Sequence, residues 1–309
     1  MRLWPVLVLI AVIAAVPLLT SANTVLNFVA AALIVALAAQ GWNILGGLAG
    51  QLSFGHAAFY GTGAYVTAVL QVRWGVNAWL GALAGVAAGA ALGTAIGAMV
   101  FRAGLRGSYF ALVTLAFAEV LRIAANAAPI TGGAAGVLVR LDPAPANFQF
   151  VSRGAFLEVA LACVAAVLLL TLWIGRTRFG AHLAAVRENE EAARALGIDP
   201  FRAKLQAMAL SAGITAAAGV LYVQYYLYID ADLVFGTGVS VAALLAPVVG
   251  GVGTVLGPVL GGLALQGLGQ AARLAAGPVP GVDQVVFGVL LVAAIAFMPG
   301  GLANPRGRA

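Results

Sequence analysis

The sequence predicts an all-α, polytopic integral membrane protein with about ten transmembrane helices. Its mean hydropathy is +1.04, and 63% of its residues are hydrophobic whereas only 8% are charged. Apolar runs of about 18 residues or more recur along the whole chain, which is typical of membrane spans and not of one buried core. A soluble domain is therefore excluded, and residues 1–309 are expected to form a single transmembrane domain.

Ten apolar segments are expected to cross the membrane. The first is better interpreted as a retained helix than as a cleaved signal peptide, because its run is long and further spans follow it. The expected ranges are 1–20, 24–45, 53–70, 78–100, 109–128, 156–174, 205–228, 239–249, 255–275 and 285–298.

The third of these spans contains most of the residues that we expect to line a translocation path. His56 is more simply a packed, hydrogen-bonded residue than a ligand, and Tyr60 lies four residues later on the same helix face. Small residues along the span allow close helix approach in lipid. The candidates for the path in this span are Ser53, His56, Tyr60 and Tyr65.

Two ionisable residues of the fifth span are expected to pair. Glu119 and Arg122 are three positions apart and so share one helix face. Charges at membrane depth are costly unless they are paired, so a local ion pair is the first interpretation. Glu119 is also a candidate for the translocation path. The segment 129–154 that follows is rich in Pro, Gly and Asn, and it is expected to be a long extracytoplasmic loop.

Two glycine-rich breaks interrupt the apolar pattern, one in each half of the chain. Residues 46–55 read GGLAGQLSFG and residues 250–259 read GGVGTVLGPV. Paired interruptions of this kind can mark internal repeats with a pathway between them. Unwound backbone is tolerated at membrane depth only where it is buried or lines water. Close helix packing explains the same glycines equally well.

One sustained polar segment, residues 176–204, stands out from the apolar background. It holds ten of the 26 charged residues of the chain. Acidic residues precede a run of good helix formers at 192–196, and Gly197 provides a C-terminal stop. We expect a short helix outside the membrane here, where a soluble partner can act on the chain.

The basic residues indicate the orientation in the membrane. Ten spans place both termini on the side of residues 176–204, and this side holds 11 of the 16 Lys and Arg residues while the other side holds 5. The positive-inside rule therefore places residues 176–204 and both termini in the cytoplasm. Eight spans would agree equally well. The net charge of +6 indicates orientation and not nucleic-acid binding.

The sequence carries no recognisable catalytic constellation. A phosphate-binding loop needs a lysine after a glycine-rich turn, but the single lysine, Lys204, follows Ala203. Two histidines and the single Cys163 give no metal-binding spacing, and no serine lies in a Gly-x-Ser-x-Gly turn. Transport or a structural role is expected, without enzymatic activity, a cofactor or a metal.

Three segments taken together resemble the LivM type of branched-chain amino acid ABC-transporter permeases. They read GLAGQLSFGHAAFYGTGAY, RENEEAARALGIDPFRAK and GGVGTVLGPVLGG, and the resemblance covers residues 30–300. Within the second segment, Glu191, Ala192, Ala193 and Gly197 match the opening of the EAA motif of importer permeases. The later Ile-x-Leu-Pro of that motif is absent, which leaves the contact geometry with an ATPase open.

The resemblance implies a permease subunit of the bacterial inner membrane. It implies a second permease subunit as heterodimer partner, two cytoplasmic ATPase subunits that hydrolyse ATP, and a periplasmic substrate-binding protein. The ATP and ADP states of the ATPases would move the cytoplasmic helix and bias the pore between its two open forms. The residues expected to provide this ATPase coupling are Glu188, Glu191, Ala192, Ala193 and Gly197. A solvated surface helix without a partner is the simpler alternative for this segment.

Three other functions stay open at this stage. The same kind of permease could carry urea, short amides or a sugar, because much of the selectivity resides in the soluble receptor. An ion-coupled secondary transporter would need buried ionisable relays, for which Glu119 is the one strong candidate. A non-transporting scaffold is disfavoured by the paired glycine-rich breaks.

Overall fold

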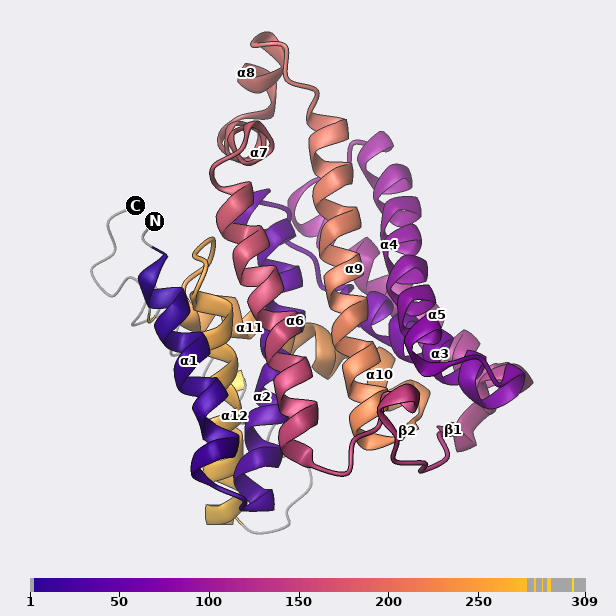
Figure 1. The fold of residues 1–309 in the computed structure, drawn as a ribbon. Helices are drawn as coiled ribbons and strands as arrows, with labels where there is room; N and C mark the ends of the chain where they lie inside the picture. The colour runs from indigo at the N-terminus through magenta and orange to yellow at the C-terminus, as the bar shows by residue number, and fades with distance from the viewer. Residues whose placement is uncertain (1–2, 277–280, 282–284, 286–287, 290–301, 303–309) are drawn as a thin grey trace.

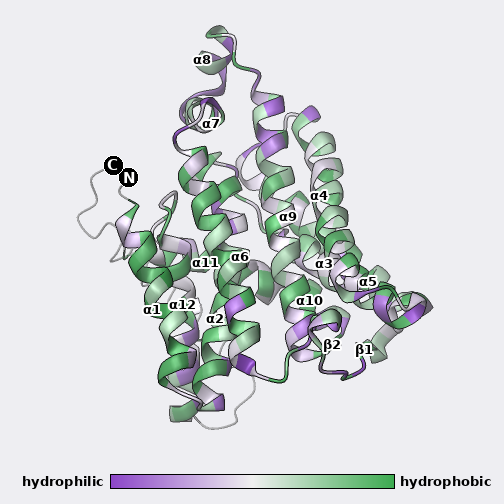
Figure 2. Ribbon diagram, in the orientation of Figure 1, coloured by the Kyte–Doolittle hydropathy of each residue, from purple (hydrophilic) through white to green (hydrophobic). Residues whose placement is uncertain are grey.

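The structure is a bundle of long helices with a small polar cap at one end. This computed structural model describes residues 3–276 and the isolated positions 281, 285, 288, 289 and 302. The short helices α7 and α8 lie beyond one end of the bundle, and the strands β1 and β2 lie at the opposite end (Figure 1). Hydrophobic residues follow the long helices, whereas hydrophilic residues gather on α7, α8 and the connecting loops (Figure 2).

The long helices follow one another along the chain with few interruptions. They are α1 (Trp4–Leu19), α2 (Asn23–Trp42), α3 (His56–Trp74), α4 (Ala78–Arg102), α5 (Gly107–Ala127), α6 (Arg153–Ile174), α9 (Pro200–Tyr226), α11 (Thr237–Gly250) and α12 (Gly257–Ala276). The shorter elements are the π-helical segment η1 (Asn43–Leu48), the 3₁₀ turns η2 (Pro129–Thr131), η3 (Gly133–Ala135) and η4 (Pro145–Asn147), the helices α7 (Arg178–Glu188), α8 (Glu190–Ala195) and α10 (Ala231–Phe235), and the strands β1 (Val137–Leu138) and β2 (Tyr228–Ile229).

The all-α membrane architecture expected from the sequence is confirmed. Within the described part of the chain, six helical segments are long and apolar enough to cross a membrane: 23–48, 78–102, 107–127, 153–174, 200–226 and 231–250. The apolar helix α1 is shorter, with 16 residues. The helices α3 and α12 occupy the third and ninth expected spans. The tenth, 285–298, falls almost entirely outside the described residues, so the structure does not establish the count of ten.

Helix α9 lies at the centre of the bundle, packed against α2, α3 and α4. Glycines make this possible, because a Cβ atom built on Gly89 of α4 would lie 2.3 Å from the Cβ of Ala216. A Cβ atom on Gly219 of α9 would lie 2.0 Å from the backbone oxygen of Tyr60. Small residues let helices approach this closely, and van der Waals contact then stabilises their association in lipid.

The segment 176–204 differs from the single cytoplasmic helix that we expected. It forms two helices, α7 and α8, which are separated at Asn189. The Asn189 side chain accepts hydrogen bonds from the backbone N–H groups of Glu191 and Ala192 at 2.9 and 3.0 Å. This is the geometry of a helix N-cap. The cap starts α8 at a position where the flanking residues would otherwise favour one continuous helix.

The expected loop 129–154 contains local structure that the sequence pattern did not reveal. Three 3₁₀ turns lie within it, and β1 pairs antiparallel with β2 so that Val137 lies opposite Ile229. Two-residue strands carry no detectable alternation of polar and apolar residues, so this pairing could not be predicted from the sequence pattern.

We predict that Gly89→Leu destabilises the bundle, because the added side chain must displace α9 at Ala216. Overpacking of this kind typically costs about 1–3 kcal/mol. The matched control is Ala87→Leu on the exposed face of the same helix. Thermal unfolding of the detergent-purified protein measures both variants, and an equal unfolding midpoint in the two would contradict the close α4–α9 contact.

Candidate functional site

The two glycine-rich breaks lie against each other in the structure. The side chain of Asn43, at the start of η1, accepts a hydrogen bond from the backbone N–H of Gly253 at 2.8 Å and donates one to the backbone oxygen of Thr254 at 2.9 Å. Asn43 is only 1% exposed. A Cβ atom on Gly47 would lie 2.7 Å from the backbone nitrogen of Gly253. One amide side chain therefore satisfies backbone groups freed by the second break, as buried irregular backbone requires.

Arg187, in the last turn of α7, connects this pair of breaks to the helices outside the bundle. Its Nη1 donates a hydrogen bond to the backbone oxygen of Gly47 at 3.0 Å. Gly50 has a positive φ of 68°, and a Cβ atom there would lie 2.6 Å from Cγ of Arg187. A movement of α7 would therefore be transmitted directly to the first break.

A charged cluster ties α8 to the bundle. Lys204 Nζ lies 2.8 Å from Glu190 Oε1, and Arg106 Nη2 lies 3.0 Å from Glu190 Oε2. The Lys204 side chain is 6% exposed and the Glu190 side chain 12%. Lys204 Nζ also lies 5.0 Å from the centre of the Phe101 ring, where a cation is attracted by the aromatic face. Charges buried to this degree are stable only when they are paired.

The residues expected to contact an ATPase lie mostly on the outer side of these two helices. Glu188 is exposed and pairs with Arg187 at 3.1 Å. Glu191 and Ala192 are exposed in the first turn of α8, whereas Ala193 is buried. Gly197 follows α8 with a φ of +83°, so the chain reverses there in a conformation that favours glycine. A polar hollow of about 320 Å³ lies beside them, lined by Gln51, Arg106 and residues 186–191.

A second hollow lies farther into the bundle, among α2, α3, α9, α11 and α12. This cavity of about 470 Å³ is the tyrosine cavity, named for Tyr60, Tyr222 and Tyr226 in its lining. The remaining wall is mostly aliphatic. Its other lining residues are Ala31, Ile34, Val35, Ala38, Asp232, Leu233, Gly236, Thr237, Gly238, Val239, Ala242, Ala243 and Gln266. Its volume lies in the usual range for small-molecule sites, about 300–1,000 Å³.

Of the five expected path residues, the structure places Tyr60 in the lining of the tyrosine cavity and the other four elsewhere. Ser53 is buried at the end of the first break, where its Oγ accepts a hydrogen bond from the N–H of Gly55. His56 is fully buried, with its Nε2 2.9 Å from the Oγ of Ser211, as expected for a packed residue. Tyr65 stacks on Phe235 with ring centres 5.6 Å apart.

Glu119 forms the expected ion pair, and the pair belongs to a larger group. Arg122 Nη2 lies 2.6 Å from Glu119 Oε1, and Arg122 Nη1 lies 2.5 Å from Asp232 Oδ1. Arg122 therefore connects α5 to Asp232, and Asp232 also lines the tyrosine cavity.

Sequence reasoning missed four residues that build these sites. Asn43, Arg187, Glu190 and Lys204 make the contacts between the breaks, α7, α8 and the bundle. A signal existed for two of them. Asn43 is one of three amide residues in a mostly apolar span and lies next to the first glycine-rich break, and Lys204 is the only lysine of the chain.

The chain is similar to known transport permeases, as a family model and named relatives show. The family model described as "Branched-chain amino acid transport system / permease component" matches residues 24–295. The high-affinity branched-chain amino acid transport system permease protein LivM of Escherichia coli is 30% identical over 273 residues, which cover 81% of this chain and 63% of that protein. LivM of Salmonella typhimurium is 30% identical over 73% of this chain and 58% of that protein.

A second kind of relative matches over nearly its full length. The permease protein LivH of the same transport system of Escherichia coli is 27% identical over 88% of this chain and 92% of that protein. The match with each LivM relative covers less than two thirds of that protein's length. No solved structure matches the chain.

We predict that Glu190→Gln destabilises the protein strongly, because it leaves the Lys204 ammonium without its carboxylate. Removing one partner of a buried pair costs about 3–5 kcal/mol. Unfolding by SDS titration measures the loss. Glu188→Gln, a control on a carboxylate that is 75% exposed, should change the unfolding free energy by less than about 0.5 kcal/mol. Equal losses in the two variants would show that the cluster of Glu190, Lys204 and Arg106 does not hold α8 in place.

Proposed function

The chain belongs to the branched-chain amino acid transport permease family, and from that premise we propose that it is a membrane-spanning permease subunit of an ATP-driven, binding-protein-dependent importer. Its solutes are the branched-chain amino acids. The single observation that carries the proposal is the hydrogen bond from Arg187 to Gly47, which joins a helix outside the bundle to the paired breaks inside it. A permease driven by a soluble partner needs such a connection.

The partners are a second permease subunit, two cytoplasmic ATPase subunits and a periplasmic substrate-binding protein. Two kinds of relative, LivM and LivH, are named as permease proteins of the same transport system, which supports a heterodimer of two different permeases. The arginine-rich side of the chain and both termini lie in the cytoplasm, and the subunit resides in the bacterial inner membrane.

The ATPases act on the exposed face of α7 and α8. Glu188, Glu191 and Ala192 lie on that face, and the polar hollow beside them can receive a side chain of a partner. A change in nucleotide state favours one position of α7, and the contact of Arg187 with the first break carries that preference into the bundle. The cluster of Glu190, Lys204 and Arg106 keeps α8 attached during this movement.

The tyrosine cavity is the part of the path that this subunit contributes. Its aliphatic wall suits an apolar side chain, and Tyr60 is the expected path residue that lines it. An ion-coupled transporter is less well supported, because Arg122 neutralises Glu119 through a bidentate contact. Among the other expected path residues, Ser53, His56 and Tyr65 act by holding the helices that surround the cavity.

We predict that proteoliposomes containing this chain with its partner subunits take up leucine only when ATP is supplied. Gly197→Pro should abolish the uptake and the co-purification of the ATPases, because proline fixes φ near about −65° where the chain needs +83°. Gly197→Asn is the matched control, since asparagine tolerates the left-handed conformation.

The proposal fails if the chain moves leucine without ATP, or if it carries no branched-chain amino acid when all partners are present. Competition with urea, acetamide and ribose in the same assay decides between the amino acids and the other solute classes. The role of the α7–α8 connection fails separately if Gly197→Pro retains the ATPases and transports at the rate of Gly197→Asn.

A further inference from the structure

The N-terminus of α11 opens into the tyrosine cavity without a cap. Gly236 precedes the helix, and no side chain accepts a hydrogen bond from its first turn. In the described part of the chain, no group accepts a hydrogen bond from the backbone N–H of Thr237 or of Gly238. Both residues line the cavity, and a Cβ atom on Gly238 would meet nothing within 4 Å. The start of a 14-residue helix with free N–H groups attracts an anion.

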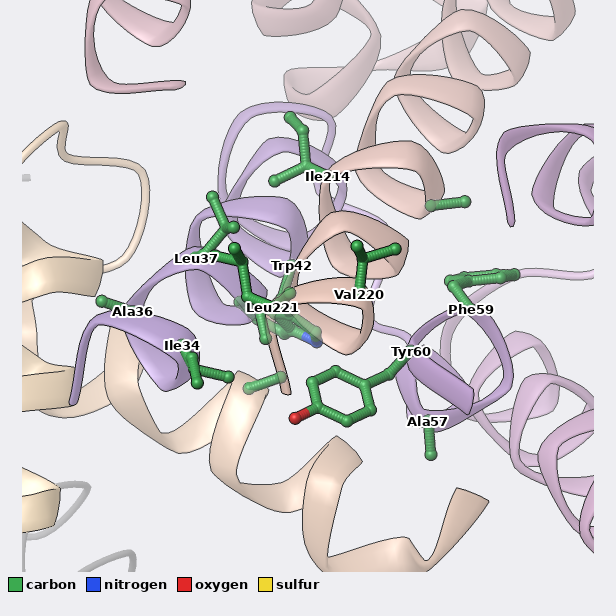
Figure 3. Close-up of a cluster of buried hydrophobic side chains, with 14 of the residues drawn as sticks. Ile34, Ala36, Leu37, Trp42, Ala57, Phe59, Tyr60, Ile214, Val220 and Leu221 are labelled. Carbon is green, nitrogen blue, oxygen red and sulfur yellow. The ribbon is translucent and has the colours of Figure 1, made fainter. Parts of the chain in front are cut away.

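A second, independent observation points to a polar ligand in the same place. Tyr60 is 5% exposed and lines the cavity, and its hydroxyl has no hydrogen-bond partner among the described residues. The hydroxyl points away from Phe59, toward the side of Ile34 (Figure 3). Because Tyr60 lines the cavity and its hydroxyl is not bound to another described residue, a donor or acceptor group of a ligand can bind the hydroxyl there.

The cavity also offers a place for a positive charge. Tyr222 and Tyr226 have ring centres 4.6 Å apart, and the ring centre of Tyr60 lies 5.8 Å from that of Tyr222. Aromatic faces attract ammonium groups. Among the described residues of the lining, Asp232 carries the only charged group, and Arg122 holds this carboxylate from outside the cavity.

Much of the lining is aliphatic. Ile34, Val35 and Ala38 of α2 line the cavity together with Val239 and Ala242 of α11. Burying an aliphatic group of about four carbons against such a wall is favourable at about 0.8 kcal/mol per CH₂ group. The cavity therefore combines an anion site, a cation site and an apolar surface within one small volume.

We propose that the tyrosine cavity binds a free aliphatic α-amino acid as a zwitterion. The carboxylate binds the N–H groups of Thr237 and Gly238 together with the Tyr60 hydroxyl. The ammonium group lies against Tyr222 and Tyr226, and the side chain packs on α2 and α11. The inference rests on the proposed function and adds the groups of this chain that recognise the solute, so that selectivity does not reside in the soluble receptor alone.

The test compares two substitutions at one position. Thr237→Pro removes the backbone N–H at the first position of α11, where proline is well tolerated, and the extended ψ of 147° at Gly236 suits a following proline. Thr237→Ala removes the same hydroxyl and keeps the N–H. Leucine binding is measured by isothermal titration of the assembled permease with its ATPases and without the binding protein. Thr237→Pro should bind leucine about tenfold more weakly than Thr237→Ala.

Two analogues test the wild-type protein without any substitution. 3-Methylbutylamine lacks the carboxylate and 4-methylpentanoate lacks the ammonium group, and each should bind at least about tenfold more weakly than leucine. The amine should bind Thr237→Pro and Thr237→Ala with the same dissociation constant. Tyr60→Phe should weaken leucine binding and leave binding of the amine unchanged.

The inference is overturned if an analogue binds as tightly as leucine, if the two Thr237 variants bind leucine equally, or if the wild-type protein shows no saturable leucine binding. ATP-dependent uptake of leucine by the same permease and ATPases in proteoliposomes, with the binding protein added, separates this failure from that of the proposed function. If uptake is observed together with any of these three binding results, the zwitterion site is wrong but the importer function is retained. Absence of leucine uptake removes the importer itself.

Discussion

The contacts of Asn43 are the constraint on which the rest of the structure depends. The chain leaves regular α-helix near residue 43 and again near residue 251, and lipid supplies no partner for the backbone groups that are freed there. Asn43 satisfies two of them with one side chain and so fixes the two breaks side by side. Gly47 can approach Gly253 this closely only because it carries no Cβ atom, which would lie 2.7 Å from the backbone nitrogen of Gly253. This pairing holds the chain just beyond the C-terminus of α11, the helix whose N-terminus lies at the tyrosine cavity.

Close packing around α9 gives this arrangement a rigid support. The glycines of α4 and Gly219 of α9 bring backbones into contact, so α3, α4 and α9 behave as one block. The breaks and α11 lie beside this block and carry the irregular backbone. A membrane protein that alternates between two open forms needs such a division between a stiff part and a part that can change. Arg187 contacts the second part, whereas Lys204 anchors α8 to the first.

The long helices could be predicted from the sequence because lipid selects for long apolar runs, and most boundaries agree within three or four residues. The paired breaks were also recognisable from their glycines. The contact between them was not, since it depends on one amide side chain about 210 positions from its partners. Asn189 divides the polar segment 176–204 through capping, which competes with strong helix propensity on both sides. The cavity could not be predicted from the sequence, because the residues that line it come from helices that are far apart in the chain.

We propose that α7 transmits the nucleotide state of the ATPases to the glycine-rich breaks through Arg187. The most direct measurement is the labelling rate of a single cysteine at Val252, a position in the second break that is 48% exposed, after Cys163→Ala removes the native thiol. The labelling rate in the assembled transporter should differ between the ATP-bound and nucleotide-free states. Arg187→Leu should abolish that difference, and Arg178→Leu, on the same helix but exposed, should preserve it. Equal rates in the two nucleotide states, or a difference that persists without Arg187, would contradict the account.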